Sequence, residues 1–317
     1  MGSALEQSRR LVLPELTGRA SRAHPNRRAL VFGDDARTYA ELHDRAARLA
    51  SVLAAGGVTA GDRVALFLHN GIEFVETLLA CHRLAAVPVP INFRLAPDEI
   101  DFILADSGAV AVVRDSPAPG AGTGTGTGTG TPGMVLEVGP SYDDAIASAP
   151  PVRETADVLE DDAALMCYTS GTTGRPKGAV LTHRNLVAST LSWIHEMRAG
   201  QDDVWLSGQP LFHIGGINGL LPFLVLGATV ILTPTSAFDP EATLRLIEAH
   251  NVTMCIFVPT QWAAICAHDA VTQIDRRQLR VAMWGASPAP PATLEAMAET
   301  FPGAAIVSAY GQTEMSG

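Results

Sequence analysis

Short apolar, β-branched runs alternate with helix-like segments along the whole chain, and this alternation strongly constrains the fold. In the first half, strand-like runs at 64–68, 87–91 and 109–113 are separated by helical patterns near 71–86 and 97–108. Strands that are joined through helices usually pair in parallel, with the helices covering the faces of the sheet. The chain is therefore predicted to fold as an α/β protein.

The second half of the chain repeats this alternation. Strand-like segments are expected at 163–170, 228–232, 253–257, 281–284 and 305–311. Helices are expected near 184–198 and onward from Pro240, Pro259 and Pro290. With 317 residues, 47% of them hydrophobic, the chain can bury a core large enough for two subdomains of ~150 residues each.

A low-complexity segment, GAGTGTGTGTGTPG at 120–133, interrupts the alternation. Its glycines suggest a phosphate-binding loop, but the segment contains no Lys, has no GxGxxG spacing and does not directly join a strand to a helix. We therefore expect a flexible surface loop.

The run from Val204 to Phe238 contains no Asp, Glu, Lys or Arg, and a membrane span of the usual ~20 residues has to be considered. A buried core segment is favoured instead. The end of the run, ATVILT, is strand-like. Gly and Pro residues are expected to break the run, namely Gly215, Gly216, Gly219, Pro222 and Gly227.

Charge and cysteine usage restrict the partners and the compartment. A net charge of -11 and a pI near 5.2 disfavour nucleic acid as a partner, because a polyanion requires clustered Lys and Arg. The N-terminal residues show no secretory or myristoylation pattern. A cytoplasmic location is predicted, with buried thiols at the four widely spaced cysteines, Cys81, Cys167, Cys255 and Cys266.

The segment YTSGTTGRPKG, residues 168–178, has the ingredients of a triphosphate-binding loop. It follows the strand-like AALMC and precedes the helix expected around Asn185. Its glycines let backbone N–H groups turn toward phosphate oxygens, its hydroxyls add donors or a metal ligand, and Lys177 adds a positive charge. It is not a Walker A loop, since Pro176 precedes Lys177 and Gly178 stands where Ser or Thr would hold magnesium.

This segment resembles the signature loop of the acyl-adenylate-forming superfamily, which includes acyl-CoA synthetases, luciferase and the adenylation domains of peptide synthetases. Three further segments match in the expected order: PLFHIGG at 210–216, WGASPAP at 284–290 and AYGQTE at 309–314. The resemblance implies that residues 1–317 form the AMP-binding N-terminal domain, with mostly parallel sheets flanked by helices in two subdomains. It also implies that this domain is incomplete at its C-terminus and that the family's small C-terminal domain is absent.

The resemblance further implies which residues hold ATP. One group would surround the phosphates, namely Thr169, Ser170, Gly171, Thr172, Thr173, Gly174 and Lys177. A second group would line the adenine pocket, with the ring of Tyr310 stacked on the base, namely Gly285, Ala286, Ser287, Ala309, Tyr310 and Gly311. Gln312 and Thr313 belong to the same nucleotide motif.

Four residues are expected to act in catalysis: Lys177, Glu314, Thr169 and His213. Glu314 would hold Mg²⁺ with help from Thr169, since a hard cation that bridges phosphates prefers oxygen ligands. His213 would gate the acyl pocket and the channel for the thiol, and the apolar segment Ile214–Ala228 would form one wall of that pocket. Amino-acid-activating relatives carry Asp at the position of His213, which disfavours an amino acid substrate here.

The resemblance implies ATP-dependent activation of a carboxylic acid, with a fatty acid favoured, to an acyl-AMP that is then transferred to CoA. An ionised carboxylate, with a pKa near ~4, needs no general base to attack phosphorus. Two alternatives stay open: a fatty acyl-AMP ligase that loads a carrier protein, and a non-catalytic fragment that only binds nucleotide. The 317-residue chain alone is expected to make no acyl-CoA, and its oligomeric state and any peripheral membrane contact stay open.

Overall fold

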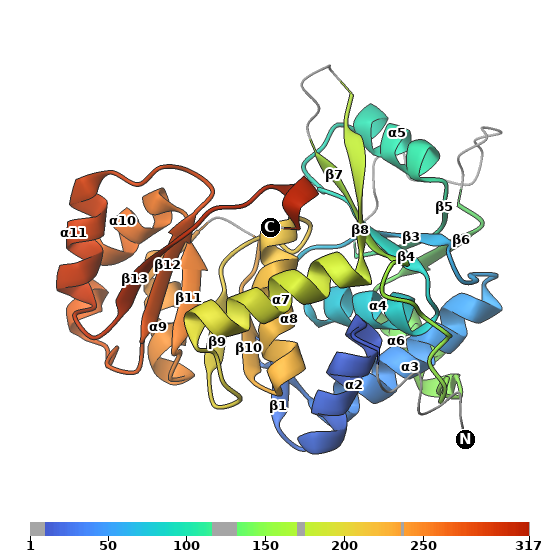
Figure 1. Cartoon of the computed structure of the whole chain (residues 1–317), viewed down its shortest axis with the longest axis horizontal. Helices are drawn as coiled ribbons and strands as arrows, with labels where there is room; N and C mark the ends of the chain where they lie inside the picture. The colour runs from blue at the N-terminus through green and yellow to red at the C-terminus, as the bar shows by residue number, and fades with distance from the viewer. Residues whose placement is uncertain (1–9, 116–131, 170–174, 236–237, 317) are drawn as a thin grey trace.

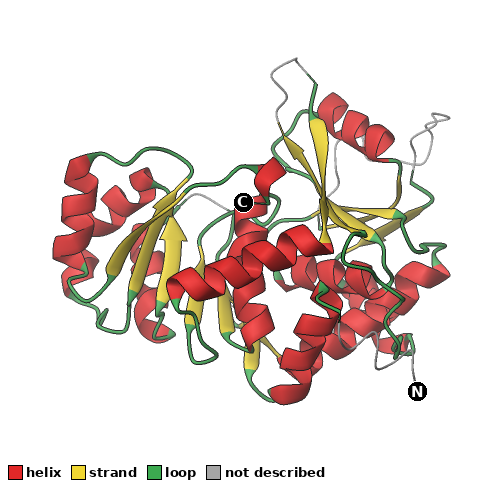
Figure 2. Cartoon of the chain, in the orientation of Figure 1, coloured by secondary structure: helices red, strands yellow, loops and turns green. Residues whose placement is uncertain are grey.

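The computed structural model describes residues 10–115, 132–169, 175–235 and 238–316. These residues form a seven-stranded sheet, a four-stranded sheet and a two-stranded hairpin (Figure 1). Helices pack against both larger sheets (Figure 2). The predicted fold class, α/β with mostly parallel sheets and flanking helices, is confirmed. Apart from Pro132 and Gly133, the Gly/Thr-rich segment lies outside the described residues.

The seven-stranded sheet is parallel except at one edge, where β2 runs antiparallel to β1. Its order is β13-β12-β11-β9-β10-β1-β2. The strands are β1 Arg28–Phe32, β2 Asp35–Thr38, β9 Val204–Ser207, β10 Thr229–Leu232, β11 Met254–Phe257, β12 Val281–Gly285 and β13 Ala305–Ala309. The carboxyl ends of β12 and β13 lie side by side at the opposite edge, so this edge carries both segments that were predicted to line the adenine pocket.

The four-stranded sheet comes from the first half of the chain and is parallel throughout, in the order β4-β3-β5-β6. Its strands are β3 Arg63–Phe67, β4 Val87–Pro90, β5 Ala109–Arg114 and β6 Met134–Glu137. The side chain of Asn70, just after β3, ties this sheet to the other one. Its Nδ2 donates to the carbonyl oxygens of Gln209 at 3.0 Å and Thr233 at 3.1 Å, and its Oδ1 accepts from the Leu211 N–H at 2.8 Å.

Helices cover the sheets through their apolar faces. They are α2 Leu13–Ala23, α3 Tyr39–Ala55, α4 Ile72–Arg83, α5 Pro97–Ser107, α6 Pro140–Ser148, α7 His183–Met197, α8 Ile214–Leu226, α9 Pro240–Ala249, α10 Pro259–Ala267 and α11 Pro291–Thr300. Two short 3-10 helices are η1 Asp269–Thr272 and η2 Thr313–Met315. In Figure 1, α9, α10 and α11 flank strands β11 to β13, whereas α7 and α8 cross the middle of the molecule.

Local sequence explains where α7 begins. The Thr182 hydroxyl accepts from the Asn185 N–H at 3.2 Å, and the Asn185 side chain accepts from the Thr182 N–H at 3.0 Å. Such reciprocal capping satisfies two backbone donors that have no partner within the helix. One large apolar core then joins the two halves of the chain and includes Phe74 of α4, Leu186 of α7 and Leu220 of α8.

The uncharged run from 204 to 238 is largely buried core where it is described, as predicted. The predicted break occurs at Gly227, the left-handed cap that ends α8 before β10, whereas Gly215, Gly216, Gly219 and Pro222 lie inside α8 and do not interrupt it. A Cβ atom at Gly216 would come within 2.3 Å of the Pro210 carbonyl oxygen, so glycine permits close packing of this helix. Within the described parts of the chain, no helix is both long enough and apolar enough to cross a bilayer.

The cysteine prediction holds for three of the four residues. Cys81, Cys167 and Cys255 are buried free thiols, whereas Cys266 is only partly buried. Burial raises the pKa of the Cys167 thiol to about 12, which keeps that thiol protonated and unreactive at neutral pH.

Candidate functional site

The signature segment forms a hairpin. Strand β7, Ala163–Thr169, pairs antiparallel with β8, Lys177–Thr182, and Thr169 lies in register with Lys177. The structure therefore inserts a strand between the signature loop and α7. The predicted phosphate-contacting residues Ser170, Gly171, Thr172, Thr173 and Gly174 lie outside the described residues.

Contacts with α5 hold the hairpin in place. The Tyr168 hydroxyl donates to the Asp106 carboxylate at 2.7 Å, and the Arg175 guanidinium lies 5.3 Å from the centroid of the Phe102 ring. Burial, and then the hydrogen bond to Asp106, raises the pKa of Tyr168. The hairpin is thus docked on α5 through β7 and through the residues just before β8, while the Lys177 side chain stays exposed to solvent.

Glu314 reaches the hairpin from a distant part of the chain. It lies in η2, and the Thr169 hydroxyl donates to its Oε1 at 3.4 Å. Asn218 of α8 anchors the same turn, because its Nδ2 donates to the Ser316 carbonyl oxygen. Thr169, Lys177 and Glu314 are therefore brought to one end of the hairpin, as the predicted shared role requires.

The oxygen atoms of Thr169 and Glu314 suit a hard divalent cation. Mg²⁺ is usually held by one or two carboxylates together with phosphate oxygens of a substrate. Across the described ranges, no group of three or more His, Cys, Asp or Glu side chains is arranged to hold a metal. These donors fit a cation that binds together with ATP better than a metal coordinated by protein alone.

The predicted adenine edge is formed by two strand ends in close contact. Gly285 is in register with Ala309, and a Cβ atom at Gly285 would lie 2.6 Å from the Ala309 carbonyl oxygen. Ala286 follows with a φ of 67°, an uncommon conformation for a residue other than glycine. The Tyr310 ring is 78% exposed, and its hydroxyl accepts from the Gln312 Nε2 at 2.9 Å, which leaves the ring available for stacking.

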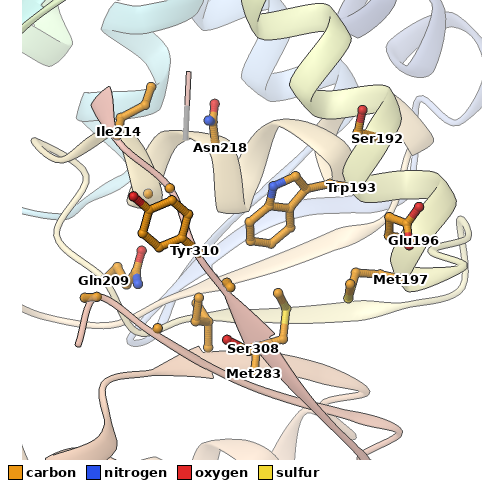
Figure 3. Close-up of a pocket in the computed structure, with 16 residues that line it drawn as sticks. Ser192, Trp193, Glu196, Met197, Gln209, Ile214, Asn218, Met283, Ser308 and Tyr310 are labelled. Carbon is orange, nitrogen blue, oxygen red and sulfur yellow. The ribbon is translucent and has the colours of Figure 1, made fainter. Parts of the chain in front are cut away.

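A cavity of about 300 Å³ opens beside this edge (Figure 3). Most of the predicted adenine residues line it, namely Gly285, Ala286, Ala309, Tyr310 and Gly311. Ser287 does not line it and is exposed. From the predicted acyl wall, Ile214, Gly215 and Asn218 line the cavity, whereas most of the following apolar side chains of α8 are buried in the core.

Helix α7 contributes lining residues that the sequence analysis did not single out, namely Ser192, Trp193, Glu196 and Met197. Trp193 and Met197 are spaced four residues apart and continue the stripe of buried Leu186 and Thr190. This helical periodicity was the available signal. The remaining lining residues come from neighbouring loops and strands, namely Gln209, Ile256, Met283 and Ser308.

His213 lines a second cavity, of about 410 Å³, together with Thr169, Arg175 and Thr313. Its ring packs on Phe212 with centroids 4.5 Å apart. His213 is exposed to solvent on one side, yet partial desolvation of its ring, and then the positive charge of Arg94, lowers the pKa of His213 and favours the neutral imidazole. His213 and its sequence neighbour Ile214 thus line two different cavities, and the gating role of His213 stays a prediction.

Comparison with known families agrees with this arrangement. The profile of the family described as AMP-binding enzyme matches residues 18–317, and the chain belongs to this family. A solved structure, the inhibitor-bound N-terminal domain of FACL13 from Mycobacterium tuberculosis, superposes with a TM-score of 0.89 at 30% identity. That match covers 96% of this chain and 77% of the other.

Two curated relatives illustrate the similarity in sequence. A feruloyl-CoA synthase from an Amycolatopsis species is 40% identical over 297 residues, which are 93% of this chain and 58% of that protein. The long-chain-fatty-acid–CoA ligase FadD13 of Mycobacterium tuberculosis is 32% identical over 282 residues, 88% of this chain and 55% of that protein. The chain thus spans less than two thirds of the length of these relatives.

Proposed function

We propose that this chain belongs to an enzyme that uses ATP to convert a carboxylic acid into an acyl-adenylate and then passes the acyl group to CoA. The observation that carries the proposal is the hydrogen bond between Thr169 and Glu314, which joins the signature hairpin to the nucleotide motif. Lys177 lies in register with Thr169 at this junction. A positive charge and oxygen ligands are therefore available where a triphosphate would have to be held.

In the first step, a carboxylate oxygen of the acid forms a bond to the α-phosphorus, and the bond from that phosphorus to the leaving pyrophosphate breaks. Lys177 would offset charge on the pyrophosphate, and Tyr310 would orient the adenine by stacking. Thr169 and Glu314 would hold Mg²⁺, which neutralises phosphate charge when it is bound. The cavity under α7 and α8 would hold the acyl part near the α-phosphorus.

CoA is the proposed acceptor because the relatives described above are named as CoA synthases or ligases. His213 would separate the acyl cavity from the path of the thiol. Names of relatives do not decide the acid, since they include feruloyl-CoA, long-chain-fatty-acid and indoleacetate enzymes. The buried free thiols fit the reducing cytoplasm, which we propose as the compartment.

The proposal is tested by replacing the proposed metal-binding carboxylate, Glu314→Gln, and measuring pyrophosphate release from ATP with a panel of acids. We expect a loss of about tenfold that excess Mg²⁺ partly restores, because an amide is a poorer ligand for a hard cation. Glu299→Gln, an exposed change on α11, is the matched control. A Glu314→Gln enzyme with unaltered Mg²⁺ dependence would rule out this carboxylate as the metal ligand.

A further inference from the structure

One wall of the acyl cavity is aromatic and is held by packing. Trp193 projects from α7 into the cavity (Figure 3). Its ring meets that of Trp205 edge to face, with centroids 6.2 Å apart and an interplanar angle of 83°. Trp205 is fully buried and stacks on Phe223 at 4.8 Å. The indole of Trp193 therefore rests on a fixed aromatic stack.

The helix that carries Trp193 is also anchored at its carboxyl end. The Arg280 guanidinium donates to the carbonyl oxygens of Met197 and Arg198, both at 3.0 Å. The same guanidinium binds the Asp203 carboxylate through two hydrogen bonds of 2.6 and 2.8 Å. Because Arg280 directly precedes β12, this network fixes the last turn of α7 to the sheet that forms the opposite wall of the cavity.

That opposite wall is lined mostly by small or apolar residues. Small residues Gly285, Ser308 and Ala309 lie at the strand ends, beside the side chains of Ile256 and Met283. The volume of about 300 Å³ stands at the lower limit of the ~300 to 1,000 Å³ that is usual for ligand pockets. Part of this volume belongs to the adenine edge, so the space left for the acyl part is a short slot between an indole and a sheet edge.

Resting on the acyl-adenylate chemistry proposed above, we propose that Trp193 is a specificity-determining residue that selects compact acids with an aromatic ring over long straight-chain acids. A ring in the slot gains an edge-to-face or offset contact with the indole, in addition to the burial of its surface. A long flexible chain gains no such contact and loses more conformational freedom when it is ordered. The proposed substrate class is therefore an aryl or arylalkenyl acid, whereas the sequence analysis favoured a fatty acid.

The test uses two hydrolysis-resistant acyl-adenylate mimics, the cinnamoyl and the dodecanoyl sulfamates of adenosine, titrated calorimetrically into this chain. Wild-type protein should bind the cinnamoyl conjugate more tightly. Trp193→Ala should bind the cinnamoyl conjugate about tenfold more weakly than the wild type and should bind the dodecanoyl conjugate as tightly or more tightly. Trp193→Phe should retain most of the preference for the cinnamoyl conjugate. Leu191→Ala, an exposed change on the same helix outside the cavity lining, is the control.

An unchanged ratio of the two affinities in Trp193→Ala, or a wild-type preference for the dodecanoyl conjugate, overturns the inference. ATP, titrated separately, reports on the nucleotide site. If ATP and both conjugates fail to bind the wild-type chain, the proposed function fails and the inference fails with it. Should Trp193→Ala not fold, as judged by thermal unfolding, Trp193→Leu takes its place, and the same shift in ratio is required.

Discussion

The proposed phosphate side and the proposed acyl side of the site are built in different ways. On the phosphate side, Lys177 and Glu314 are exposed, and a single hydrogen bond of 3.4 Å joins Thr169 to Glu314. On the acyl side, Trp193 rests on buried aromatic rings and on a helix anchored by Arg280. Charged side chains that bind a hydrated triphosphate can remain exposed to solvent. Discrimination between acids of different shape requires side chains that are held rigidly by packing. Substitutions on the phosphate side should therefore affect chemistry alone, and those on the acyl side should affect stability as well.

Acidification should give the largest difference between the two sides, because it destabilises the packing at the N-terminal end of α7, the helix that carries Trp193. His82 and His183, the first residue of α7, are buried with their rings 5.4 Å apart. Burial lowers the pKa of His82 to about 4 and that of His183 to about 3. Below the ordinary value of 6.5, the unfolded chain binds protons that the folded chain does not, so stability falls as the pH drops from 6.5 toward 4. The loss should reach on the order of 3 kcal/mol for each histidine.

Urea unfolding at several pH values measures this loss. His183→Asn keeps an acceptor for the Leu13 N–H and removes one titrating group, so the variant should lose less stability in acid than the wild type. His195→Gln, an exposed change on the same helix, should leave the pH dependence of the unfolding free energy unchanged. Equal acid sensitivity of His183→Asn and wild type would contradict the role of the buried pair.

Lys177→Ala should have the next largest effect, on activity only. Losing a charge-assisted contact to phosphate is worth ~1.5 to 3 kcal/mol, which corresponds to roughly a tenfold to hundredfold slower release of pyrophosphate. The free energy of unfolding should change by less than about 0.5 kcal/mol, because the side chain is exposed. Lys177→Arg, which keeps the charge, is the matched variant and should retain part of the activity. Unchanged pyrophosphate release in Lys177→Ala would remove this residue from the phosphate site.

Asp203→Asn should show the opposite behaviour. It removes the carboxylate that holds Arg280, and we expect a loss of about 2 kcal/mol in unfolding free energy, less than for a fully buried pair because Arg280 is partly exposed. Binding of the cinnamoyl conjugate should weaken while the affinity for ATP stays the same. Asp202→Asn, at the exposed neighbouring position, is the control. If ATP affinity fell as much as conjugate affinity, the division between the two sides would be wrong.

Ala286→Gly should give the smallest effect, a gain in stability. The left-handed conformation costs alanine roughly 1 kcal/mol, although glycine loses more backbone freedom on folding. We expect a net gain of at most about 1 kcal/mol in thermal or urea unfolding. A clear loss of stability would show that the turn at Ala286 is not strained.

Sequence reasoning succeeded where local pattern and geometry coincide. Strands β12 and β13 begin at the predicted residues 281 and 305, although they end one residue later and two residues earlier than predicted, and the helices α9 and α10 begin at Pro240 and Pro259 as predicted, because β-branched runs and helix-starting prolines act locally. The family motifs also marked Thr169, Lys177 and Glu314, which the fold brings to one end of the hairpin.

The rest depended on partners that are distant in the sequence. Strands β1 and β9 are short, and each is held between two neighbours: β1 pairs with β2 and β10, and β9 pairs with β10 and β11. Strand β8 begins with Lys177 and Gly178, a poor strand pattern that pairing with β7 overrides. The sequence does not distinguish Trp193 from other residues of its helix, because its proposed role in substrate selection depends on packing against Trp205 of strand β9. Pro222 in α8 is tolerated because the surrounding core holds the helix.

The place of β1 in the large sheet has a consequence for synthesis on the ribosome. Leu30 pairs with Val230, so the partner of this N-terminal strand is translated 200 residues later. At ~5 to 20 residues per second, the wait is about 10 to 40 s. During that time β1 exposes apolar side chains on both of its faces, Leu30 and Val31, and one unpaired edge to which other chains can pair. A nascent chain should therefore engage holding chaperones until β10 emerges, and slowing translation between β2 and β10 should increase aggregation of newly made protein.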